Sequence, residues 1–138
     1  MKAFRRLTSS AAIVDRVDVD TDQIIPKQFL KRIERTGFGE FLFYDWMKDP
    51  AFPLRRPEFA SAPILATGRN FGCGSSREHA AWAIQEFGFQ AVVAESFGDI
   101  FKTNASKNGL LTVALPEADV RELLESAQVS YEIDDTLV

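Results

Sequence analysis

The sequence predicts an α/β fold with a parallel sheet, and most of the evidence lies in its second half. Short apolar segments alternate there with longer segments whose apolar residues recur at helical spacing. This order of strand, helix, strand, helix, strand and helix is typical of parallel strands joined by helical crossovers. The chain has 138 residues, of which 46% are hydrophobic and 26% charged, so we expect one domain over residues 1–138.

The first third of the sequence is irregular. Residues 11–17 predict a short strand, and the acidic run at residues 18–22 predicts a solvated turn. Pro26 limits any helix around it to a short piece. The aromatic segment at residues 36–46 is expected to pack either in the core or at a subunit interface. Four prolines between residues 50 and 63 predict an extended surface loop.

The regular part begins with a predicted strand at residues 64–67, followed by a helix. Ala80, Ile84 and Phe87 lie on one face of that helix, and Gly88 is expected to end it.

Two more strand–helix pairs follow, with strands predicted at residues 91–94 and 110–115. Ser96 is suited to cap the second helix, which Gly109 ends, and Pro116 opens the third. Residues 131–138 predict an edge strand. The buried faces of the two helices are expected to hold eight apolar side chains: Phe97, Ile100, Phe101, Ala105, Val120, Leu123, Leu124 and Ala127.

Composition and charge exclude several classes of function. No apolar run approaches the roughly 20 residues that a bilayer span needs, so we expect no membrane partner. The net charge of −4 argues against nucleic acid as a partner. The chain has one cysteine, Cys73, and one histidine, His79, so it can form neither a disulfide framework nor an iron–sulfur or structural zinc site of its own. A cytoplasmic protein without a metal site of its own is therefore predicted.

The segment after the strand at 64–67 is the predicted site of chemistry, because ligands of parallel sheets bind at the carboxyl ends of strands, beside helix N-termini. Gly72 and Gly74 allow positive φ angles and close approach of a ligand. Arg77 offers a planar fork for a carboxylate, and Ser75 and Ser76 offer hydroxyl groups. This composition predicts a site for a small polyanion.

A structural alternative exists for the same residues. Ser75 and Glu78 have the spacing of a capping box, which needs no ligand, although Ser76 could be the cap while Ser75 faces a ligand. A Cys73–His79 nucleophilic pair is disfavoured because a loop-to-helix junction separates the two residues.

Three segments carry a resemblance to a known family: Asp-Thr-Asp-Gln-Ile-Ile-Pro at residues 20–26, Phe-Gly-Cys-Gly-Ser-Ser-Arg-Glu-His-Ala at 71–80 and Phe-Gly-Asp-Ile-Phe at 97–101. The sequence resembles the small subunits of 3-isopropylmalate dehydratase, which are similar to the swivelling C-terminal domain of aconitase. The resemblance implies a three-layer β/β/α domain with a parallel sheet. Members of this family are longer, so it also implies that their C-terminal segment is absent from this chain.

The resemblance further implies half of an enzyme of leucine biosynthesis. A separate large subunit would carry a [4Fe–4S] cluster, and the two chains would isomerise 2-isopropylmalate to 3-isopropylmalate by dehydration and rehydration. Ser75 would act as the base, and Ser76 and Arg77 would bind a substrate carboxylate. Asp22 would lie near the same site and also bind substrate. Lys31 and Arg32 would bind substrate too, and the loop that holds them would set side-chain specificity.

Two alternatives remain open at this point. The same scaffold could act on another hydroxy-diacid, such as homoaconitate or dimethylmalate. The residues around Lys31 and Arg32 would discriminate, because an arginine that reaches the substrate would favour an extra carboxylate over an isopropyl group. The chain could also be a non-catalytic anion-binding module in which Ser75 is only a helix cap.

Overall fold

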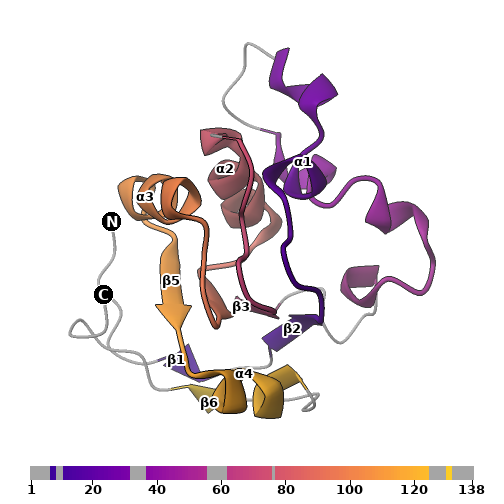
Figure 1. Cartoon of the computed structure of the whole chain (residues 1–138). Coiled ribbons are helices and arrows are strands. Elements are labelled where there is room, and N and C mark those ends of the chain that lie inside the picture. The colour runs from indigo at the N-terminus through magenta and orange to yellow at the C-terminus, as the bar shows by residue number, and fades with distance from the viewer. Residues whose placement is uncertain are drawn as a thin grey trace.

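The structure is a computed structural model that describes residues 7–8, 11–31, 37–55, 62–75, 77–124 and 130–131. Its centre is a four-stranded parallel sheet in the order β2 (Ala11–Val14), β3 (Ile64–Thr67), β4 (Ala91–Ala94) and β5 (Leu111–Ala114). Figure 1 shows the arrangement. The predicted parallel sheet is therefore confirmed.

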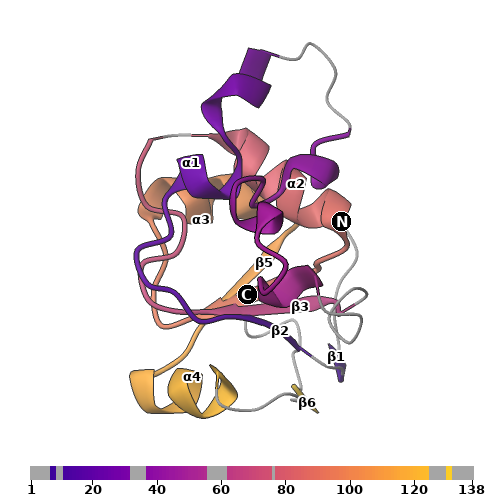
Figure 2. The same ribbon diagram turned by 90° about the vertical axis from the view of Figure 1, so that its right-hand side faces the viewer.

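Helices cover both faces of this sheet. Figure 2 shows α1 (Thr21–Ile24), α2 (Glu78–Phe87) and α3 (Asp99–Lys107) on one side, and α4 (Glu117–Leu124) on the other. A small antiparallel pair, β1 (Leu7–Thr8) with β6 (Ser130–Tyr131), lies on the side of α4.

The strands are mostly apolar, with threonines only at Thr67 and Thr112 in β3 and β5, because both faces of the sheet are largely buried. Side chains alternate along each strand, so Ala12, Leu65 and Val92 belong to the core beneath α2 and α3. Ile64 and Val93 belong to the core on the α4 face. This alternation explains why four short segments of mostly small and β-branched residues hold two layers of helices.

Four short 3₁₀ helices connect β2 to β3 within the described part of the chain: η1 (Lys27–Lys31), η2 (Gly39–Phe41), η3 (Trp46–Lys48) and η4 (Pro53–Arg55). Pro26 separates α1 from η1, as predicted. The surface loop predicted at residues 50–63 is wrong in part, because Phe52 and Leu54 are buried in the core.

The aromatic segment at residues 36–46 divides between two environments. Phe38 and Phe43 are fully buried, which confirms the core alternative for them. Phe41, Tyr44 and Trp46 are half-buried, and a role for these three in an interface stays a prediction.

The predicted strands and helices after residue 63 are confirmed within two residues at each described end, with two errors of detail. Ile100 is 50% exposed, because α3 begins only at Asp99 and the face that it buries holds Phe101 and Ala105. Ser96 does not cap α3, because its hydroxyl accepts a hydrogen bond from the Asn70 backbone N–H at 2.9 Å. Ala127 and residues 132–138 lie outside the described residues, so the predictions made for them are untested.

No helix within the described ranges is both long and apolar enough to cross a membrane.

Candidate functional site

Three loops meet at the carboxyl ends of β2, β3 and β4, and the loop after β3 lies between the other two. The backbone N–H groups of Gly72 and Cys73 donate to the carbonyl of Val19, at 2.8 and 3.2 Å. On the other side, the N–H of Gly98 donates to the carbonyl of Phe71 at 2.9 Å. The order of the strands thus brings the predicted loop at residues 68–77 into contact with segments far away in the sequence.

Glycine is required at two positions of this loop. Gly72 has φ +80°, and a Cβ there would lie 2.4 Å from the ring of buried Phe101. Gly74 has φ +96°, and a Cβ there would lie 2.4 Å from the carboxylate of Asp20. The predicted need for positive φ and close approach is confirmed, but the groups that approach are the protein's own side chains.

The acidic run before α1 forms a helix cap rather than a solvated turn. Asp20 is the N-cap of α1 and accepts a hydrogen bond from the Asp22 N–H at 2.6 Å. Gln23 completes the capping box by accepting from the Asp20 N–H at 2.9 Å. Asp20 is thereby committed to local structure, and Asp22 is left to face the neighbouring loop.

Asp22 and Arg77 form an ion pair between that helix and the loop after β3. Arg77 Nη1 lies 2.7 Å from Asp22 Oδ1 and also donates to the carbonyl of Ile25 at 3.3 Å. Asp22 Oδ1 accepts a second bond from the Lys27 N–H at 3.0 Å. The Arg77 hydrogen bond, with the charge of the guanidinium, lowers the pKa of Asp22 below its ordinary 3.8, so both partners are charged at neutral pH.

Ser75 lies next to this pair and caps no helix. The capping box predicted from Ser75 and Glu78 is wrong, because α2 begins at Glu78 and its N-cap, Arg77, is extended and makes no side-chain cap bond. Two bonds explain the difference. The guanidinium of Arg77 is held by Asp22, and Glu78 Oε1 accepts instead from Asn108 Nδ2 at 3.1 Å.

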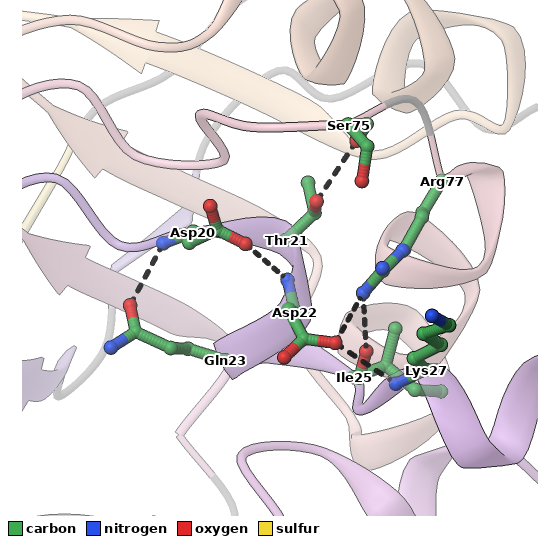
Figure 3. A network of polar contacts seen from close by, with 8 residues as sticks. All are labelled: Asp20, Thr21, Asp22, Gln23, Ile25, Lys27, Ser75 and Arg77. Atoms are coloured by element: carbon green, nitrogen blue, oxygen red, sulfur yellow. Dashed lines mark hydrogen bonds and ion pairs between the residues drawn. The ribbon is translucent and has the colours of Figure 1, made fainter.

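The Ser75 hydroxyl is exposed and has no hydrogen-bond partner among the described residues. Its backbone carbonyl accepts from Thr21 Oγ1 at 2.9 Å, so the position of the residue is fixed while its hydroxyl is free to react. Figure 3 shows the Ser75 and Arg77 side chains pointing from their loop toward α1. Thr21 is a site residue that sequence reasoning missed, since a buried threonine between two aspartates has no periodic signal.

The other predicted substrate-binding residues divide into two groups. Lys31 is exposed at the end of η1, and no described contact joins it to Ser75 or Arg77. Ser76 and Arg32 lie outside the described residues, so the structure does not test their roles.

Cys73 and His79 do not form a nucleophile and base. Burial, aided by the nearby Asp20 and Asp18, raises the pKa of the Cys73 thiol, which keeps it protonated and unreactive. His79 packs against the rings of Phe38 and Trp82, at centroid distances of 5.1 and 4.7 Å.

The residues of this chain do not fit an iron–sulfur cluster. Such a cluster needs about four thiolate ligands, and the chain has one cysteine. Among the described residues, no group of three histidine, cysteine, aspartate or glutamate side chains could hold a metal ion. What the arrangement offers is the guanidinium of a partly buried Arg77, a free serine hydroxyl and the N-terminus of α2, which together suit a small carboxylate.

Comparison with known proteins gives one consistent result. The aconitase C-terminal domain family matches residues 1–118. A 3-isopropylmalate dehydratase small subunit of Acidobacterium capsulatum is 63% identical, and the match covers 93% of this chain and 62% of that protein. A small subunit of the same name from a Geobacillus species is 56% identical over 99% of this chain and 73% of its own length.

A solved structure agrees with these matches. The crystal structure of a 3-isopropylmalate dehydratase from Methanocaldococcus jannaschii superposes with a TM-score of 0.64 at 34% identity, covering 82% of this chain and 64% of that one. The chain therefore spans about two thirds of the length of the proteins that it matches. It belongs to the aconitase C-terminal domain family and, within it, to the small subunits of 3-isopropylmalate dehydratase.

Proposed function

We propose that this chain is the small subunit of a two-chain hydro-lyase that converts 2-isopropylmalate to 3-isopropylmalate, and that its Ser75 loop takes part in catalysis. One observation carries the proposal. The segments at residues 20–26 and 71–80, which carry the resemblance, meet in one network in which Arg77 pairs with Asp22 and Thr21 binds the carbonyl of Ser75. The shared name of the relatives favours 2-isopropylmalate over other hydroxy-diacids.

The reaction removes a proton from one carbon and a hydroxyl group from its neighbour, which gives an alkene and water, and then adds water back in the opposite sense. In the proposal, Ser75 takes the proton from the carbon. A serine hydroxyl is a weak base, so its alkoxide must be stabilised at neutral pH. The cation of Arg77 and the positive end of α2 supply that stabilisation.

Binding of the substrate is assigned to the neighbouring residues. Arg77 binds a carboxylate, Ser76 assists it, and Asp22 stands beside them. Lys31, the last residue of η1, and Arg32 after it belong to the loop to which the resemblance assigns specificity for the substrate's side chain. The proposed large subunit brings the [4Fe–4S] cluster, because this chain's residues do not fit one. We also propose that residues 1–138 belong to a single domain and that the protein is cytoplasmic.

Reconstitution tests this function. The chain would be co-purified anaerobically with the large subunit of a 3-isopropylmalate dehydratase, and formation of the alkene from 2-isopropylmalate would be followed. Homoaconitate and dimethylmalate would be assayed beside it. Turnover of 2-isopropylmalate with the highest kcat/KM supports the proposal, whereas a stable complex that prefers either other acid contradicts the assigned substrate. Failure to form any complex would contradict the two-chain enzyme.

A further inference from the structure

The hydrogen bonds of Arg77 are distributed unevenly over its guanidinium group. Nη1 carries two hydrogens, and it has two acceptors, Asp22 Oδ1 at 2.7 Å and the carbonyl of Ile25 at 3.3 Å. Nε and Nη2 have no hydrogen-bond acceptor among the described residues. The donors that remain lie on one edge of the group, the edge formed by Nε and Nη2.

That edge has the geometry that a carboxylate prefers. Two parallel N–H groups match the two oxygens of a carboxylate, and the pair they form is stronger and more directional than a single bond. The Arg77 side chain is only 13% exposed, so its stem is fixed by packing and its plane is set by what Nη1 binds. Asp22, whose side chain is 57% exposed, supplies the shorter and charged one of those two bonds.

Asp22 also fixes the start of η1. The oxygen that binds Arg77 accepts the Lys27 N–H at 3.0 Å, and Lys27 is the first residue of η1. One carboxylate oxygen therefore joins the guanidinium to the segment that leads to Lys31. A change at Asp22 is expected to disturb both at once.

We propose that Asp22 is a positioning residue, which holds Nη1 of Arg77 so that the Nε–Nη2 edge faces the substrate carboxylate. This inference deepens the proposed function and rests on it. Asp22 then makes no contact with the substrate, unlike the direct substrate-binding role assigned to it by resemblance. The opposite role would be competition, in which the Asp22 carboxylate beside Arg77 weakens binding of an anionic substrate.

Kinetics of the two-chain complex separate these roles. If Asp22 positions Arg77, Asp22→Ala raises KM for 2-isopropylmalate about tenfold, with a smaller change in kcat, and Asp22→Asn, which keeps an acceptor oxygen, raises it less. In an Arg77→Lys background, Asp22→Ala changes KM less than about twofold, because lysine has no second edge to orient.

Asp45→Asn is the matched control, since Asp45 forms an exposed ion pair with Lys48 at 3.5 Å, and it leaves KM unchanged. A lower or unchanged KM for Asp22→Ala, or equal effects in both backgrounds, overturns the inference.

A measurement on the chain itself makes the inference independent of turnover. In the 138-residue chain, the side-chain NMR signals of Arg77 are assigned by their loss in Arg77→Lys. While Asp22 holds Nη1, rotation about the Cζ–Nη1 bond is slow, and the Nη groups give resolved signals. In Asp22→Ala this rotation is expected to become fast, so that the Nη signals average into one. Identical Arg77 spectra in both proteins overturn the inference. Absence of turnover in the unsubstituted complex contradicts the proposed function instead, and the Arg77 signals then decide whether Asp22 positions this group.

Discussion

The hydroxyl of Thr21 donates a hydrogen bond of 2.9 Å to the backbone carbonyl of Ser75, a residue 54 positions later in the sequence. Thr21 is 1% exposed, so its hydroxyl is shielded from solvent. The backbone of the two segments is joined as well, by the Thr21 N–H and the carbonyl of Cys73 at 2.8 Å. The acidic motif and the serine loop are thus one structural unit.

Thr21→Val tests whether this bond positions the serine. The substitution removes the hydroxyl and keeps the volume, which costs about 1 kcal/mol in the free energy of unfolding and releases the Ser75 carbonyl. Thr21→Ser is the control, because it costs a similar amount by removing a buried methyl group but keeps the bond. We expect turnover of the complex to fall with valine and persist with serine. Equal turnover of the two variants, measured beside their denaturant unfolding curves, would show that the bond has no catalytic role.

Gly72→Ala tests the close packing of the loop against α3. The substitution places a Cβ in a backbone with φ +80° and against the ring of Phe101, which is buried. Gly88→Ala also places a Cβ on a backbone with positive φ, at +127°, but that Cβ meets nothing within 4 Å, so this variant shows the cost of backbone strain without a clash. We expect Gly72→Ala to lower the free energy of unfolding about 1–3 kcal/mol more than Gly88→Ala does. Equal losses would contradict the packing described here.

The single histidine gives a prediction about pH. Burial lowers the pKa of His79 below its ordinary 6.5, with Arg77 acting in the same direction and Glu78 against it. The folded protein therefore takes up this proton less readily than the unfolded chain. Its stability is constant above pH 6.5 with respect to this group, and it falls as pH drops from 6.5 toward the lower folded pKa.

NMR titration of that one histidine measures the pKa directly, because the chain has no other. A midpoint below 6.5 is expected, together with loss of the corresponding slope in the unfolding free energy for His79→Gln. A midpoint at or above 6.5 would contradict the burial of the ring between Phe38 and Trp82.

The second half of the fold could be predicted from the sequence because local signals and tertiary packing agree there. The strands at Ile64–Thr67 and Ala91–Ala94 have the predicted bounds, since both are short apolar segments buried on two faces and bounded by turn residues. Gly88 and Gly109 end their helices with positive φ, as glycines after an apolar periodic segment do.

Errors arose where tertiary contacts replace local ones. Ser75 and Glu78 have the spacing of a capping box, but α2 begins only after Arg77, and the Glu78 carboxylate binds Asn108, 30 residues later, instead of the Ser75 N–H. The spacing of two residues does not show that one of them will bind a residue distant in the sequence instead. The same limit hid the Asp22–Arg77 pair, which could be placed near one site only through resemblance and not from spacing.

Ser75→Ala in the reconstituted complex tests the central claim most directly. Because Ser75 is exposed and caps no helix, its loss is expected to change the free energy of unfolding by less than about 0.5 kcal/mol. Loss of the base is expected to reduce kcat by at least about a hundredfold. Ser106→Ala, an exposed serine of α3, should change neither quantity. Near-normal turnover of 2-isopropylmalate by the Ser75→Ala complex would contradict the claim that this loop carries the catalytic base.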